Sequence, residues 1–151
     1  MNVEIFNWSK FLKYCGSPIV TKKTLSKILV SEFSGYNISE LGIIFVEEEY
    51  MIKLNSEFRG IDSVTDVLSF NIDTKPLVGE VYICPEFVNS NFSGEKYFEE
   101  VMRNIVHGFL HILGFDHNEK FISEYESKEE MFVKQEYILH NILNEINRRS
   151  G

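Results

Sequence analysis

The feature that most constrains the fold is a long apolar segment in the second half of the chain, residues 94–115. From Val101 onward its apolar residues fall on almost every side of a helix, and Gly114 provides a stop. A helix that is apolar all round is stable only when it is buried. We therefore expect this helix to run through the middle of the domain, with the rest of the chain packed around it.

Shorter patterns predict the elements that surround this helix. Four apolar runs with alternating or β-branched residues predict strands, the first of them at a sheet edge. These runs are residues 3–7, 41–46, 65–72 and 79–84. Capping residues and three-to-four periodicity predict further helices from Thr21 to Gly35, over 47–60, from Pro85 to about Phe92, and over about 122–148. The sum is an α+β domain with one small four-stranded sheet and about five or six helices.

The composition is that of one globular domain. With 151 residues, of which 44% are hydrophobic and 25% charged, and with no repeat or linker, the chain is expected to form a single domain over residues 1–151. No continuous apolar segment predicts a secretory signal or a membrane span. The two cysteines, Cys15 and Cys84, form neither a Cys-x-x-Cys motif nor a disulfide framework. These observations favour a cytoplasmic protein without a membrane partner.

The net charge of −8 argues against a protein that coats nucleic acid by bulk charge alone, but it leaves room for a local basic groove. Residues 1–30 carry five lysines against one acid, whereas residues 119–136 carry six acids against three lysines. Solvated helix faces explain this polarity more simply than a binding patch does.

Three of the four histidines lie within eleven residues, in the segment HGFLHILGFDH at 107–117. His107 and His111 are four residues apart, so they project from the same face of a helix, one turn apart. Gly114 then turns the chain back and could bring His117 over the same point. Three imidazole nitrogens leave the fourth position of a zinc ion open for water, which is typical of a catalytic site. The sequence thus predicts one metal ion per chain at the end of the buried helix, with zinc as the first choice, although three imidazoles also suit nickel, copper and iron.

The competing interpretation is that these histidines are core or surface groups without an ion. It is the weaker one, because burying three imidazoles without partners would cost roughly a few kcal/mol each. His140, in the predicted last helix, fits no ligand array and is interpreted as a surface residue.

The histidine array matches the outline of the metzincin proteases, His-Glu-x-x-His-x-x-Gly-x-x-His, except at its second position. Gly108 stands where the general-base glutamate would be, so a peptidase would need a base from elsewhere. A phosphodiester makes a different demand, because the group to be stabilised is an anion. An arginine can bond two phosphate oxygens at once. Arg59, at a predicted helix end, is a candidate for that role.

Four segments together resemble the YbeY family of bacterial endoribonucleases, which are also called ribosomal RNA maturation factors. They are LNSEFRG (54–60), TDVLSF (65–70), GEVYI (79–83) and HGFLHILGFDH (107–117). They stand in the family order with family-like separations, so the resemblance extends over the whole chain.

The resemblance implies a fold, a site and a function. The fold is a small mixed sheet flanked by helices, with the metal in an open cleft. At the site, His107, His111 and His117 would bind the zinc ion, and Arg59 would be the catalytic arginine. The implied function is single-strand-specific cleavage of RNA in ribosomal RNA processing, with ribosomal RNA and the small ribosomal subunit as partners. That processing includes maturation of the three-prime end of the small-subunit RNA, and ribosome quality control.

Two segments depart from the family pattern. Glu80 and Val81 stand where the family usually has Asp-Ile, and Asn71 replaces a proline after TDVLSF. Asp66 and Glu80 are interpreted as strand-end residues that hold loops, with a part in the chemistry as the open alternative. The sequence names neither the general base nor the oligomeric state.

Two other functions remain as alternatives to the nuclease. One is a metallopeptidase with an unconventional general base, which the same three histidines would permit. The other is a non-catalytic ribosome assembly factor whose zinc ion is structural.

Overall fold

The structure is a computed structural model that describes residues 1–16, 20–115 and 121–150, and the side chains of these ranges except 121–129 and 150. Within them lie four strands and six helices. In chain order these are β1 Asn2–Phe6, α1 Trp8–Leu12, α2 Lys22–Phe33, β2 Glu40–Phe45, α3 Glu48–Arg59, β3 Val67–Thr74, β4 Leu77–Ile83, α4 Pro85–Asn91, α5 Glu95–Ile112 and α6 Phe121–Ser150.

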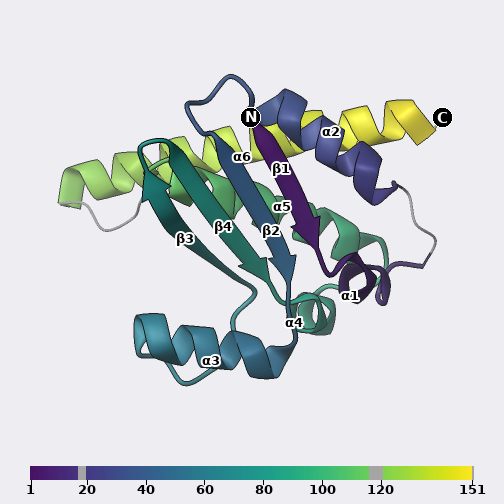
Figure 1. Cartoon of the computed structure of the whole chain (residues 1–151), viewed down its shortest axis with the longest axis horizontal. Coiled ribbons are helices and arrows are strands. Elements are labelled where there is room, and N and C mark those ends of the chain that lie inside the picture. The colour runs from purple at the N-terminus through teal and green to yellow at the C-terminus, as the bar shows by residue number, and fades with distance from the viewer. Residues whose placement is uncertain (17–19, 116–120, 151) are drawn as a thin grey trace.

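The four strands form one mixed sheet in the order β1-β2-β4-β3. β1, β2 and β4 are parallel neighbours, whereas β3 runs antiparallel to β4 at the far edge. The expected α+β domain with a four-stranded mixed sheet is confirmed, and so is the edge position of β1. In Figure 1, α5 and α6 lie behind the sheet, and α3 lies below the carboxyl ends of the parallel strands.

α5 is the central helix of the core, as the sequence predicts. Eleven of its eighteen residues are buried, from Tyr97 to Ile112. It packs against β3, β4, α4 and α6. One of its rings, Phe109, stacks on Phe33 of α2 with ring centroids 3.8 Å apart. The chain therefore folds around α5 because its apolar faces have no other place free of water.

Local signals set several boundaries as predicted. The Thr21 hydroxyl accepts a hydrogen bond from the backbone N–H of Thr24 and caps α2. Gly60 ends α3 in the left-handed conformation, with φ of 68°. Pro85 occupies the first turn of α4, where no N–H is required of it.

The structure adds one helix to the prediction and shortens one predicted connection, which still contains Pro76. α1 was not predicted: it has only five residues and begins after Asn7, whose side chain makes no cap. The connection between β3 and β4 was predicted to be longer, but both strands continue until Thr74 pairs with Leu77. A tight hairpin turn therefore replaces the expected loop. Among the described residues, no helix combines the length and apolar character that crossing a membrane requires.

Candidate metal centre

Two glycines allow α5 to approach the sheet closely. A Cβ atom on Gly108 would lie 2.7 Å from Cγ1 of Val81, and one on Gly79 would lie 2.5 Å from Cδ1 of Ile112. Real Cβ atoms do not come so close to other carbons, so each glycine fills a position with no room for a side chain. The second position of the histidine motif thus faces β4, which is a physical reason for glycine there and leaves no space for a glutamate.

His107 and His111 project from another side of α5 and form what we call the histidine pair. Both residues are half-buried. Their Nε2 atoms are 3.0 Å apart, and their rings cross at 78° with centroids 4.5 Å apart. The predicted one-turn spacing therefore does bring two imidazole nitrogens to one point.

The histidine pair fits a shared ion. Two imidazole nitrogens that each lie about 2.0 to 2.1 Å from a tetrahedral zinc ion are about 3.3 Å from one another, close to the observed separation. No group of three possible metal ligands occurs among the described residues. The predicted third ligand, His117, lies outside them.

Gln135 of α6 contacts His107 directly. Its Oε1 atom lies 2.7 Å from Nδ1 of His107, and its side chain is buried, with 8% exposure. No sequence motif marks this residue. The available signal was a polar side chain within the apolar stripe of the last helix, between Met131 and Ile138.

An ion-pair cluster holds Gln135 from the other side. The Gln135 Nε2 group donates to the carboxylate of Glu136 at 3.2 Å, and Arg103 binds both oxygens of that carboxylate at 2.9 and 3.0 Å. Hydrogen bonding to Arg103 lowers the pKa of Glu136, while burial raises the pKa of Glu100, which also pairs with Arg103. Glu136 is therefore an ionised acceptor at neutral pH.

Asn71, a departure from the family pattern, connects β3 to the end of α5. Its Nδ2 group donates to the backbone carbonyl of Ile112 at 3.1 Å. That carbonyl belongs to the last turn of the helix, where backbone acceptors lack helical partners. The contact holds the strand edge against the turn that carries His111.

Arg59 is placed quite differently. It is the last residue of α3, it is exposed, and it makes no ion pair with another described residue. The Asn55 side chain donates to the Ser63 carbonyl at 2.9 Å and so fixes the loop that follows. The ring of the neighbouring Phe58 packs edge-on against the ring of Phe70 in β3, with the ring centroids 5.0 Å apart. No hydrogen bond among the described residues connects Arg59 to the histidine pair.

The side-chain hydrogen bonds of Asp66 and Glu80 among the described residues are with residues one or two positions away in the chain. Asp66 accepts from the Thr65 hydroxyl at 3.3 Å, just before β3. Because neighbouring strand residues point to opposite faces and Val81 packs on α5, Glu80 faces away from α5. Its carboxylate accepts from the Tyr82 hydroxyl at 3.1 Å. Burial, followed by the Glu80 charge, raises the pKa of Tyr82 to about 12.

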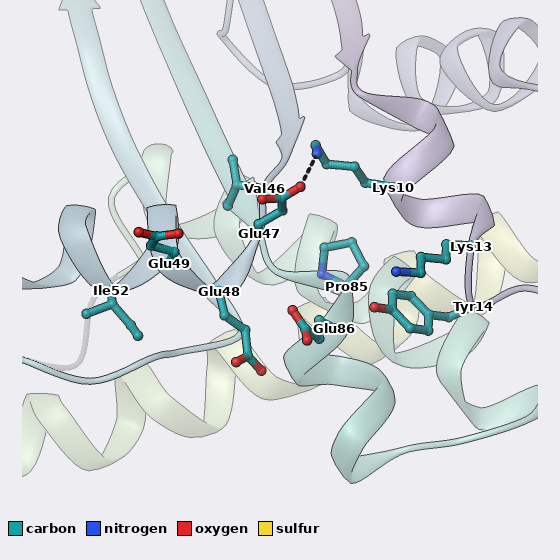
Figure 2. A pocket seen from close by; sticks show the side chains of 10 residues that line it. All are labelled: Lys10, Lys13, Tyr14, Val46, Glu47, Glu48, Glu49, Ile52, Pro85 and Glu86. Atoms are coloured by element: carbon teal, nitrogen blue, oxygen red, sulfur yellow. Dashed lines mark hydrogen bonds and ion pairs between the residues drawn. The ribbon is translucent and has the colours of Figure 1, made fainter.

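A hollow of about 480 Å³ lies elsewhere, at the carboxyl ends of the parallel strands, between α1, α3 and α4 (Figure 2). Lys10 pairs with Glu47 across it at 2.8 Å, and this hydrogen bond lowers the pKa of the Glu47 carboxyl. Pro85, which follows the end of β4, lines the hollow, whereas Ile112 packs on Gly79 near the start of that strand. The hollow is therefore not part of the histidine site.

The sequence model of one protein family, described as endoribonuclease YbeY, matches residues 17–143. The chain belongs to the YbeY family. A Thermotoga maritima protein named endoribonuclease YbeY is 33% identical over 128 residues, covering 82% of this chain and 79% of that protein. A Bdellovibrio bacteriovorus protein with the same name is 33% identical, covering 99% of this chain and 100% of that protein.

A solved structure agrees with the family match. The solution structure of a Thermotoga maritima protein matches with a TM-score of 0.65 and 26% sequence identity, covering 97% of this chain and 93% of that one. The YbeY family match includes the positions of Arg59, the three predicted zinc ligands and Gln135.

Proposed function

We propose that the protein is a zinc-dependent endoribonuclease that cuts single-stranded RNA during ribosomal RNA processing. The proposal includes three-prime end maturation of the small-subunit RNA, ribosome quality control, and a cytoplasmic location. Its first support is membership of the YbeY family, since the matched relatives are named endoribonucleases.

The observation that carries the proposal is the convergence of the Nε2 atoms of the histidine pair, 3.0 Å apart, on a helix otherwise buried in the core. In the proposal, His107 and His111 hold one zinc ion together with His117. The ion would supply a Lewis acid for the phosphoryl group and make water a better nucleophile at neutral pH.

Arg59 supplies the second element, a guanidinium for the scissile phosphate. Its exposure leaves its hydrogen-bond donors available to a substrate, and its planar fork can bind two phosphate oxygens. The phosphate gains negative charge as water attacks, so a cation there favours the transition state over the ground state.

Neither alternative function gains support. A metallopeptidase of the metzincin kind would need a carboxylate at position 108, where β4 leaves no room for a side chain. A non-catalytic assembly factor is not what the endoribonuclease names of the relatives describe.

The test compares cleavage of a labelled single-stranded RNA with cleavage of the same sequence in a duplex. We expect the purified protein to cut the single strand, to lose this activity on chelation and to regain it with zinc. His111→Ala should be inactive under all three conditions, whereas His140→Ala, which changes an exposed histidine, should match the unchanged protein. Equal cleavage by His111→Ala or by the chelated protein would overturn the proposal.

Ribosomal RNA from cells tests the processing role separately. Cells that carry only His111→Ala should accumulate small-subunit RNA with an unprocessed three-prime end. Normal processing in those cells would contradict a catalytic role in maturation.

A further inference from the structure

We propose that Gln135 is a positioning residue that sets the tautomer of His107 and thereby selects its Nε2 atom as the nitrogen that faces His111. The inference deepens the proposed function, because it concerns the same pair of predicted zinc ligands. It assigns a role to a residue in α6 that the histidine motif does not contain.

The position of the Gln135 side chain is the first observation. The side chain is 8% exposed and lies in the interface between α5 and α6. Its Oε1 atom is 2.7 Å from Nδ1 of His107, which is at the short end of the range for N–H···O hydrogen bonds. A buried amide must find partners for both of its ends, so its orientation follows from its surroundings.

The orientation of the amide is fixed by Glu136. The Gln135 nitrogen lies 3.2 Å from the Glu136 carboxylate, which can only accept. The nitrogen end must therefore point to Glu136, and the oxygen end must point to His107. A flipped amide would place its oxygen against the Glu136 carboxylate, which has no proton to donate, and lose that hydrogen bond.

Arg103 keeps Glu136 in place. Its guanidinium binds both oxygens of the carboxylate, at 2.9 and 3.0 Å, and also pairs with Glu99 and Glu100. Three carboxylates thus surround one arginine. A fourth carboxylate at position 135 would add like charge, whereas glutamine provides the same acceptor without charge.

The tautomer follows from these contacts. An amide oxygen can only accept, so Nδ1 of His107 carries the proton and donates it. In a neutral imidazole with its proton on Nδ1, the other nitrogen, Nε2, carries the lone pair that a metal ion needs. This is the nitrogen that lies 3.0 Å from Nε2 of His111. Arg103, Glu136, Gln135 and His107 therefore form one chain of contacts in which each member orients the next.

The experiment measures tautomer and zinc affinity without RNA. Ring ¹⁵N chemical shifts of the metal-free protein are recorded about two units above the ordinary imidazole pKa of about 6.5. The exposed His140 serves as the internal reference for an unconstrained ring. We expect His107 to be protonated at Nδ1. Protonation at Nε2 would overturn the inference by itself, with no variant needed.

Variants of Gln135 give the second readout, zinc affinity in competition with a chromophoric chelator. Gln135→Leu should lower zinc affinity about 10- to 100-fold, as loss of an outer partner of a metal-binding histidine does. Gln135→Glu keeps an acceptor oxygen and should restore most of the affinity. Asn141→Leu, the same kind of change on α6 away from His107, should leave it unchanged.

Unchanged affinity and an unchanged His107 tautomer in Gln135→Leu would contradict the inference. Equal losses in Gln135→Leu and Gln135→Glu would also contradict it, because the acceptor would then not matter. These results are independent of nuclease activity: a protein that binds zinc as predicted but cuts no RNA would refute the proposed function and leave the role of Gln135 intact.

Discussion

The histidine pair and Arg59 differ in how far each is held in place before a ligand arrives. The His107 ring contacts the buried Gln135 side chain, and the Nε2 atom of His111 lies 3.0 Å from Nε2 of His107. The helix that carries both histidines packs closely on the sheet. Arg59 is an exposed residue at the end of α3 and has no ion-pair partner among the described residues. The difference suits what each region is proposed to bind. A metal ion binds more tightly to side chains that are already fixed in position, whereas a flexible RNA can bind to an exposed, solvated side chain.

The largest expected effect comes from Arg59→Ala. Loss of a hydrogen-bond donor to the transition state should lower the cleavage rate about 10²- to 10³-fold. Because the side chain is exposed, the free energy of unfolding should change by no more than about 0.5 kcal/mol, with zinc affinity unaffected. Single-turnover cleavage, denaturation and chelator competition on the same protein measure all three.

Two further variants control that experiment. Arg59→Lys should recover only part of the rate, because an ammonium cannot bind two phosphate oxygens as a planar fork does. Lys53→Ala removes another exposed cation from α3 and should have little effect. If Arg59→Ala lowered zinc affinity as much as cleavage, the histidine pair and Arg59 would not act independently.

The next largest effect is expected from Gly108→Ala, which changes the contact between α5 and β4 beside the histidine pair and leaves the region of Arg59 unchanged. The added methyl group would meet Val81, and overpacking of this kind costs about 1 to 3 kcal/mol, offset by up to about 1 kcal/mol of helix propensity. Urea denaturation should show a net loss of stability. Gly35→Ala, where the new methyl group meets open space, provides the control.

A double mutant tests the cause of that loss. Val81→Ala makes room for the methyl group, so the two substitutions together should cost less than the sum of their separate effects. Additive costs would show that the contact between residues 108 and 81 is not the reason for glycine in the histidine motif.

A smaller effect is expected from Asn71→Ala. The variant leaves the Ile112 carbonyl without its side-chain donor, which should lower stability by about 1 kcal/mol. Amide hydrogen exchange should rise in the last turn of α5 and not in α3. Asn91→Ala removes a similar amide-to-carbonyl contact in α4 and should leave exchange in α5 unchanged. Equal amide exchange in α5 for the two variants would show that the Asn71 side chain does not stabilise the last turn of α5.

The smallest expected effect is a pH dependence at Glu136. Its pKa is lowered in the folded state, mainly by hydrogen bonding to Arg103, so the unfolded chain takes up the proton first on acidification. The stabilisation is complete above the ordinary carboxyl value and is lost as the pH falls through the folded-state value. The side chain is 33% exposed, so the contribution should be below about 1 kcal/mol.

The difference in stability between the unchanged protein and Glu136→Gln isolates this contribution. It is the right comparison because burial raises the pKa of Glu100, which acts in the opposite sense as the pH falls. A difference that stays constant down to strongly acidic pH would show that the Arg103 contact does not stabilise the ionised form.

The sequence predicted the parts of the molecule that depend on periodicity and local signals. The apolar character of 94–115 predicted the buried helix, and Thr21, Gly60 and Pro85 predicted helix boundaries that the structure confirms. The one-turn spacing predicted that His107 and His111 meet. The third ligand, His117, stays a prediction because it lies outside the described residues.

What the sequence left out depends on contacts between distant segments. Gln135 and His107 are separated by 28 positions, and only the packing of α6 on α5 brings them together. The absence of a side chain at Gly108 acquires a reason only when Val81 is placed opposite it. Asn71 was visible as a departure from the family pattern, but its partner in α5 was not. Such pairings follow from sheet order and helix packing, which no local pattern encodes.

The decisive measurement is the zinc content of freshly purified protein, determined by elemental analysis for the unchanged protein, His111→Ala and Arg59→Ala. We expect one zinc ion per chain in the unchanged protein and in Arg59→Ala, although that variant should cut RNA poorly, and almost none in His111→Ala. Zinc retained by His111→Ala, or lost from Arg59→Ala, would contradict a metal site built on the histidine pair and separate from Arg59.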